Sequence, residues 1–238
     1  MVKIPEYGDP TLRAMYREIE KTPRETRDYL GASLIGNDCA RQIWYTYNGF
    51  KGEDFSAETL MNFEDGHRTE DLTAERLRMV DGIKLITHKE NGEQLGFSSL
   101  GGKFQGHYDG VITGILQAPK APHIWEAKCS AEKKFKEFQN AKAKFGEKNA
   151  LENWNQNYYA QAQLYMYYGG IDRHYLTVAK AGGRGYDSAR TNYDEAVAAK
   201  YIDRADKIIN AGEPPPKINQ KKDFFICRWC AFKDMCHG

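Results

Sequence analysis

The chain lacks the marks of a membrane or secreted protein, and it lacks a dominant charge. Its 238 residues contain no run near the roughly 20 apolar residues that a membrane-spanning helix needs. Residues 1–6 contain no apolar signal-peptide core. Lys and Arg number 34 against 33 Asp and Glu, a net charge of +1. We therefore expect a cytoplasmic protein that makes no membrane contact and that meets any polyanion only through local basic patches.

Cysteine is scarce and unevenly placed. Cys39 lies alone in the first part of the chain, whereas Cys227, Cys230 and Cys236 form a C-x2-C-x5-C run in the last part. In a reducing compartment such cysteines are more plausibly metal ligands or buried thiols than disulfides. Four thiolates close a tetrahedral site if the fold brings both groups together, and zinc and a [4Fe–4S] cluster both satisfy that geometry. Cys129 is then the spare fifth cysteine.

Hydrophobic periodicity predicts both helices and strands. Helical spacing predicts helices over 11–30, 33–47, 56–80, 131–144, 151–168 and 192–211. Alternating or β-branched segments predict strands over 84–88, 94–98, 103–113, 123–129 and 171–180. This order predicts a mixed α/β (α+β) fold with a central mixed β-sheet flanked by helices. We expect a single domain over residues 1–238, within which segments 31–50 and 217–238 form a cysteine-cluster subregion.

One strand pattern indicates catalysis. Residues two apart on a strand face the same way, so Glu126 and Lys128 project together while Ala127 offers its carbonyl. Asp109, on the neighbouring predicted strand, adds a second carboxylate. Such an oxygen-rich pocket suits Mg²⁺ or Mn²⁺, which activate a bound water while a lysine stabilises phosphate charge. The pattern predicts a metal-dependent nuclease, and its alternative is a solvated surface ion pair.

A helix after these strands has two candidate polar pairs. Gln161 and Tyr165 lie at i and i+4, so they share a face that could reach a phosphate or a base. Gln163 and Tyr167 have the same spacing two residues further along the helix. We favour the pair that begins at Gln161.

A lysine-rich helix precedes that segment and is the best candidate for contact with a polyanion. Its lysines are Lys133, Lys134, Lys136, Lys142, Lys144 and Lys148. The alternative is that they form a solvated face. Phe135 and Phe138 on the same helix either pack inward or stack on unpaired bases.

Taken together, these motifs resemble the PD-(D/E)XK nuclease superfamily, and specifically its RecB-like iron–sulfur exonuclease branch. That branch includes CRISPR-associated RecB-like nucleases, AddB-type nuclease domains and some phage exonucleases. The matching motifs follow the family's order across nearly the whole chain. They are Cys39-Ala40-Arg41, Gly66-His67, Gly106-His107-Tyr108-Asp109, Glu126-Ala127-Lys128, Gln161 with Tyr165, and the cysteine trio Cys227, Cys230 and Cys236. The resemblance implies a restriction-endonuclease-like core.

The resemblance also implies roles for individual residues. The catalytic set would be Asp109, Glu126, Lys128, Gln161 and Tyr165. The ligands of Mg²⁺ or Mn²⁺ would be His67, Asp109, Glu126 and the Ala127 carbonyl. The [4Fe–4S] cluster would be bound by Cys39, Cys227, Cys230 and Cys236, while His237 leaves a structural Zn²⁺ open as the alternative. Glu70 is either a further ligand or a partner of one. Because histidine is unusual for Mg²⁺ but acceptable to Mn²⁺, we expect manganese activity at least equal to magnesium activity.

The expected function is a DNA exonuclease that hydrolyses phosphodiester bonds at single- or double-stranded ends. The setting would be phage or prokaryotic recombination, repair or DNA processing, with a recombination or CRISPR-adaptation protein as a partner. One alternative is a catalytically inactive iron–sulfur or zinc protein that binds DNA as a scaffold. A thiol redox enzyme built on Cys227 and Cys230 is disfavoured, because that pair does not follow a strand–helix junction.

Overall fold

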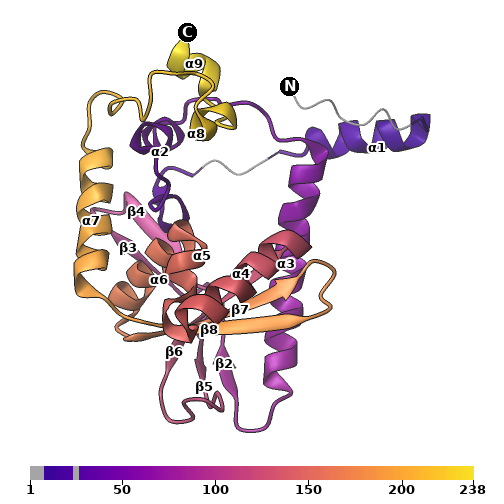
Figure 1. The fold of residues 1–238 in the computed structure, drawn as a ribbon, viewed down its shortest axis with the longest axis vertical. Coiled ribbons are helices and arrows are strands. Elements are labelled where there is room, and N and C mark those ends of the chain that lie inside the picture. The colour runs from indigo at the N-terminus through magenta and orange to yellow at the C-terminus, as the bar shows by residue number, and fades with distance from the viewer. Residues whose placement is uncertain (1–7, 24–26) are drawn as a thin grey trace.

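A five-stranded mixed sheet forms the centre of the computed structural model, which describes residues 8–23 and 27–238 (Figure 1). Its order is β2-β5-β6-β7-β8, with β6 and β7 parallel and the other neighbouring pairs antiparallel. The strands are β2 (Lys84–Ile86), β5 (Gly110–Thr113), β6 (His123–Ser130), β7 (Arg173–Lys180) and β8 (Tyr186–Asn192). The predicted fold class, a central mixed sheet flanked by helices, is confirmed.

Helices cover both faces of this sheet. They are α3 (Ala57–Arg78) on one face and α4 (Glu132–Phe145), α5 (Ala150–Trp154) and α6 (Gln156–Gly169) on the other. Phe135 and Phe138 of α4 pack with Leu176 of β7, whereas Ala74 of α3 packs with Trp125 of β6. Burial of such apolar side chains is the main source of stability for a layered fold. Phe135 and Phe138 therefore point inward and are not available to stack on bases.

A second, three-stranded sheet lies beside the first and was not expected from the sequence. Its order is β1 (Leu30–Gly31), β4 (Phe104–His107) and β3 (Gly96–Ser99). The predicted single strand over 103–113 is wrong, because the chain leaves the small sheet after His107 and enters the large one at Gly110. Asp109 therefore lies at the crossing between the two sheets.

The predicted helix over 11–30 is too long. Helix α1 spans Pro10–Glu20, and the side chain of its N-cap Asp9 accepts the backbone N–H of Thr11 at 2.7 Å. Residues 27–29 are not helical, and the chain then enters β1. The rest of this prediction, residues 24–26, lies outside the described residues. The other short elements of the first half are η1 (Ala32–Leu34) and α2 (Ala40–Tyr47).

Two further predicted helices differ from those observed. The predicted helix over 151–168 is broken between α5 and α6 at Asn155, whose φ of −153° and ψ of 108° are extended. Its side chain accepts the backbone N–H of Tyr158 and so begins the second helix. The predicted helix over 192–211 begins later, as α7 (Glu195–Ile209), because Asn192 ends the unpredicted strand β8.

The C-terminal segment packs against the region of α2, so that the yellow and indigo parts of the ribbon lie together (Figure 1). This segment contains α8 (Phe225–Arg228) and α9 (Lys233–His237). The Phe232 ring lies 5.3 Å from the Tyr45 ring, and the Glu53 N–H donates to the Ala231 carbonyl at 3.0 Å. Residues near position 40 and residues near position 230 thereby become neighbours. In the described part of the chain, none of the helices combines the length and the apolar character needed to cross a bilayer.

Candidate functional site

A cleft of about 600 Å³ opens where β6, α3 and α6 meet, beside the crossing between the two sheets. The sequence-predicted nuclease residues all line it, and they are His67, Glu70, Asp109, Glu126, Ala127, Lys128, Gln161 and Tyr165. The fold thus gathers residues from positions 67 to 165 around one cavity. Asp71, the residue after Glu70 on α3, is exposed and does not line the cleft.

Asp109, Glu126 and Lys128 form the charged floor of the cleft. One Asp109 carboxylate oxygen, Oδ2, accepts the backbone N–H of Ala127 at 2.7 Å. Lys128 Nζ donates to Glu126 Oε1. Glu126 is 4% exposed, and its second oxygen, Oε2, is buried without a hydrogen-bond partner among the described residues. A buried carboxylate oxygen with no partner is costly, so this atom marks a position that a cation or water would stabilise.

The carboxylates in the cleft hold their protons tightly. Burial, with the charge of Asp109, raises the pKa of Glu126 from 4.5 to about 8, against the opposing effect of Lys128. Burial and Asp109 likewise raise the pKa of Glu70 from 4.5 to about 7, and burial raises the pKa of Asp109 itself. Burial opposes the charge of Lys128, but Glu126 and Asp109 raise its pKa overall. A divalent cation would relieve the repulsion among the three carboxylates.

The donor set fits a hard divalent cation. In residues 8–23 and 27–238, no three His, Cys, Asp or Glu side chains converge closely enough to hold one ion by themselves. Mg²⁺ commonly needs only one or two protein carboxylates and keeps several waters. Glu126 Oε2, which no described residue hydrogen-bonds, and the neighbouring Asp109 supply that minimum.

The two candidate glutamine–tyrosine pairs have different surroundings. Gln161 Nε2 donates to the Tyr165 hydroxyl at 2.8 Å, and both residues are buried in the cleft wall. Gln163 instead donates to the Asn192 carbonyl at 3.0 Å and accepts an N–H from the start of α7, and Tyr167 is 50% exposed. The pair that begins at Gln161 is therefore the one placed at the cleft.

Sequence reasoning missed several residues of the cleft wall, among them Tyr158 and Arg27. The ring centroid of Tyr158 lies 5.1 Å from Lys128 Nζ, a cation–π distance. Its position three residues before Gln161 on one helix face was an available signal. Arg27 lines the cleft from the segment before β1. It was overlooked because the sequence placed it inside a helix that ends earlier.

The lysine-rich helix, in contrast, does not line the cleft. Lys142 binds Asp187 at 2.6 Å, Lys148 binds Asn192 at 2.9 Å, and Lys136 lies 3.6 Å from Glu132. These contacts tie part of the lysine set to neighbouring elements of the fold.

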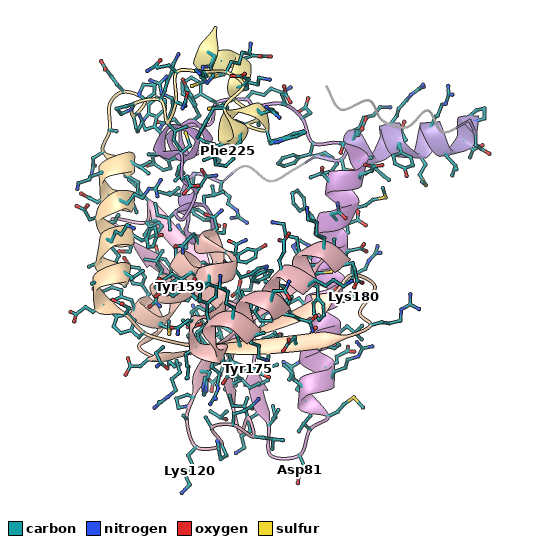
Figure 2. All side chains as sticks on the ribbon, viewed as in Figure 1. Asp81, Lys120, Tyr159, Tyr175, Lys180 and Phe225 are labelled. Atoms are coloured by element: carbon teal, nitrogen blue, oxygen red, sulfur yellow. The ribbon has the colours of Figure 1, made fainter. Side chains whose placement is uncertain are left out.

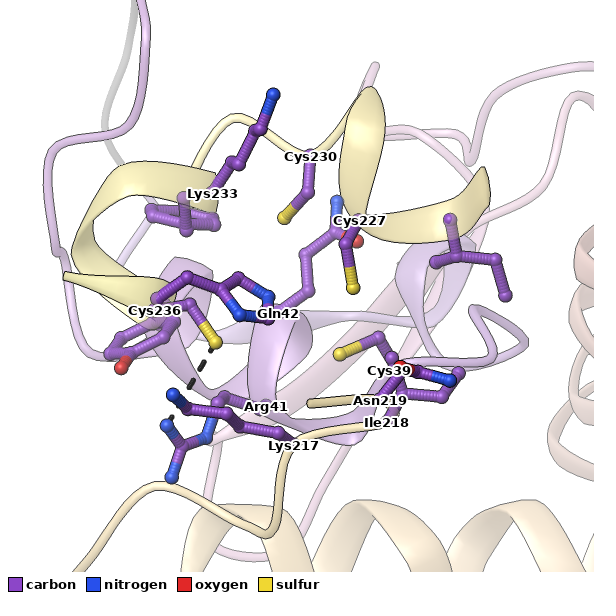
Figure 3. Close-up of a pocket in the computed structure, with 14 residues that line it drawn as sticks. Cys39, Arg41, Gln42, Lys217, Ile218, Asn219, Cys227, Cys230, Lys233 and Cys236 are labelled. Atoms are coloured by element: carbon purple, nitrogen blue, oxygen red, sulfur yellow. Dashed lines mark hydrogen bonds between the residues drawn. The ribbon is translucent and has the colours of Figure 1, made fainter. Parts of the chain in front are cut away.

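A second pocket brings together both groups of cysteines (Figure 3). Cys39, Cys227, Cys230 and Cys236 line it, and none of them is in a disulfide. Cys39 is the N-cap residue of α2, and Cys227 lies on α8. Burial raises the pKa of the Cys227 and Cys230 thiols, with further contributions from neighbouring cysteines. His237 also lines this pocket, whereas Cys129 lies in the cleft.

Comparison with known proteins shows a similar fold. No known family matches the sequence, and no curated protein sequence does. An alkaline exonuclease from Laribacter hongkongensis, LHK-Exo, is 13% identical, with a TM-score of 0.52 over 77% of this chain and 87% of that chain. A structure of LHK-Exo in complex with dAMP gives a TM-score of 0.51 at 13% identity, over 76% of this chain and 86% of that one. At this identity the likeness concerns the fold alone.

Proposed function

We propose that the protein is a metal-dependent deoxyribonuclease of the PD-(D/E)XK type that degrades DNA from its ends. The observation that carries the proposal is the buried Glu126 Oε2, which has no hydrogen-bond partner in the described part of the chain and lies in a cleft shared with Asp109 and Lys128. The fold of LHK-Exo, an exonuclease, supports the same conclusion. A solvated surface ion pair is disfavoured, because Glu126 is buried and Lys128 lies mostly within the cleft.

Asp109 and Glu126 would hold Mg²⁺ or Mn²⁺, with the Ala127 carbonyl and His67 as further candidate ligands. When bound, the ion supplies an acidified water and neutralises charge that develops on the phosphate. Lys128 keeps its proton and can donate from Nζ to the attacking water or to a phosphate oxygen. The pKa of Tyr165 is raised by burial, so its hydroxyl stays protonated and can donate a hydrogen bond. Gln161 orients that hydroxyl through its amide.

We further propose that Cys39, Cys227, Cys230 and Cys236 bind a [4Fe–4S] cluster, with a structural zinc as the alternative. The pocket that all four cysteines line, none of them in a disulfide, supports a four-thiolate site, and the family resemblance favours the cluster over zinc. The cluster would fasten the C-terminal segment to α2, and its binding energy would become folding energy.

The decisive experiment combines spectroscopy with a cleavage assay. The protein is purified without oxygen and incubated with end-labelled single- and double-stranded DNA and Mn²⁺, with Glu126→Gln as the matched control. A broad absorbance at about 400 nm, together with end-dependent degradation that the variant lacks, is the expected result. Degradation that persists unchanged in the variant would contradict the catalytic assignment. A protein that binds DNA but never cuts it would be the inactive scaffold instead.

The biological setting would be phage or prokaryotic recombination, repair or CRISPR-linked DNA processing. DNA ends are the proposed substrate in each case. The structural similarity to LHK-Exo supports an exonuclease fold in general, and it does not favour any one of these settings over the others.

A further inference from the structure

Two large aromatic side chains are exposed in the C-terminal segment, residues 217–238, although side chains of this type are usually buried in folded proteins. Trp229 is 76% exposed and Phe225 is 67% exposed. By comparison, Trp44 is 7% exposed and Trp125 is fully buried. Large exposed aromatic side chains that lie close together in sequence often mark a binding surface. We call this segment the tail.

The tail is also more basic than the chain as a whole. It contains five lysines or arginines and two aspartates, a net charge of +3, whereas the whole chain carries +1. Lys222 is paired with Asp234 at 2.9 Å. Arg228, which lies between the two aromatic residues in sequence, is exposed and donates to the backbone carbonyl of Asp223 at 3.3 Å. The combination of exposed rings and positive charge complements a polyanion that also presents flat aromatic groups.

One residue of the tail lies beside the start of α6, the helix that forms part of the cleft wall. Ile226 of α8 lines a small polar pocket together with Asn155 and Asn157, at the start of α6. The next residue of α6 is Tyr158, which lines the cleft. Figure 2 shows Phe225 on the side of the tail that is nearer α5 and α6. A strand that leaves the cleft past Tyr158 would therefore meet the tail.

We propose that Phe225, Arg228 and Trp229 form a stacking surface for unpaired nucleotides of DNA whose end occupies the cleft. The rings would stack on bases, and Arg228 would contact the backbone phosphates. Stacking on aromatic side chains requires bases that have left the duplex stack, so the surface selects single-stranded segments. A surface that bound another protein through apolar contacts alone would not need the surrounding positive charge. This inference rests on the proposed nuclease function, because that function identifies the nucleic acid.

The test measures binding without cleavage. Fluorescein-labelled oligo(dT) and a blunt-ended DNA hairpin are titrated into full-length Glu126→Gln protein, purified without oxygen, with Phe225→Ala and Trp229→Ala added singly and together. We expect the double change to weaken oligo(dT) binding on the order of tenfold or more, and to affect the blunt hairpin much less. Trp229→Phe should retain most of the affinity, because a phenyl ring can still stack. Phe145→Ala, which removes an exposed ring on α4, is the matched control and should leave both affinities unchanged.

The possible outcomes separate this proposal from the nuclease proposal. Unchanged oligo(dT) binding by the double variant would overturn the stacking surface, even if the parent protein cuts DNA. Weakened binding in a protein that never cuts DNA would sustain the surface and overturn the nuclease. If the double variant loses affinity equally for both DNA forms, or loses the visible spectrum, its tail has misfolded. Trp229→Lys would then be tested in its place. Unchanged oligo(dT) binding by Trp229→Lys would overturn the proposal. A change in oligomeric state on mutation would identify a contact between copies of the chain and would also overturn it.

Discussion

Asp109 accepts the backbone N–H of Ala127 through Oδ2 at 2.7 Å, and this bond ties the crossing between the two sheets to the strand that carries Glu126 and Lys128. The same carboxylate raises the pKa of both neighbouring glutamates. Asp109 therefore acts on the cleft in two ways, as a structural acceptor and as a negative charge.

These two roles can be separated by substitution. Asp109→Asn retains an oxygen that can accept the Ala127 N–H, so we expect a stable protein whose cleavage rate falls on the order of a hundredfold or more. Asp109→Ala also removes the hydrogen bond and should lower the free energy of unfolding by about 1–2 kcal/mol. Cleavage of end-labelled DNA and urea unfolding measure the two effects. Asp71→Asn, an exposed change on α3, is the control. Equal stability loss in both Asp109 variants would contradict the structural role.

The stability of the metal-free protein should fall as the pH rises. The pKa of Glu126 is raised from 4.5 to about 8 and that of Glu70 from 4.5 to about 7. A carboxyl group whose pKa is raised by folding stabilises the folded state while it is protonated. This contribution to stability is fully present below about pH 4.5 and is lost as the pH rises through 7 and 8. Thermal unfolding in the presence of EDTA, from pH 6 to pH 9, measures this loss.

Adding the metal should reverse that trend. A bound cation favours the ionised carboxylates, and at high pH fewer protons must leave these groups when the cation binds. Mn²⁺ should therefore raise the melting temperature more at pH 9 than at pH 6, by on the order of 5 °C. Glu126→Gln removes one of the titrating carboxyl groups and should reduce the difference between the two pH values. A shift of equal size at both pH values would contradict the assignment of the cation to these carboxylates.

The cysteine pocket gives a prediction with an internal control. Cys39→Ser removes the one pocket ligand that lies outside the tail, so we expect loss of the absorbance at about 400 nm and a clear fall in the melting temperature. Cys129→Ser changes the cysteine that lies in the cleft and should leave the spectrum unchanged. Metal analysis of the two proteins distinguishes iron from zinc. A Cys39→Ser protein with full iron content would contradict the proposed ligand set.

Local patterns in the sequence predicted much of the cleft. The E-x-K spacing placed Glu126 and Lys128 on one face of β6, and helical spacing placed His67 and Glu70 on one face of α3, because both relationships depend only on backbone periodicity. Helix α3 begins where predicted, with Ser56 as its N-cap. The central mixed sheet followed from the order of these elements.

Long-range relationships were not predictable in the same way. The sequence over 103–113 reads as one continuous strand. It is divided at Asp109 only because its two parts pair with different strands. Strand β8 has few β-branched residues and owes its conformation to pairing with β7. Arg27 reaches the cleft from the segment before β1, which no local spacing connects to the other cleft residues, whereas Tyr158 lies three residues before Gln161 on α6. The shared cysteine pocket also depends on packing between residues almost two hundred positions apart, and it was expected through the family resemblance and not through any local spacing.

Two glycines near the cleft should respond to alanine in opposite ways. A Cβ at Gly106 would lie 2.7 Å from ring carbons of both Tyr165 and Phe97, so Gly106→Ala should lower the free energy of unfolding by about 1–3 kcal/mol and displace Tyr165. A Cβ at Gly66, inside α3, would have no neighbour within 4 Å. Gly66→Ala should therefore stabilise the protein by about 0.5–1 kcal/mol through helix propensity. Urea unfolding measures both changes, and cleavage should fall only in Gly106→Ala, because the Tyr165 hydroxyl that Gln161 orients would move. Stabilisation by both alanines would show that β4 can move away from α6 without strain, and the close packing at Gly106 would then not be what positions Tyr165.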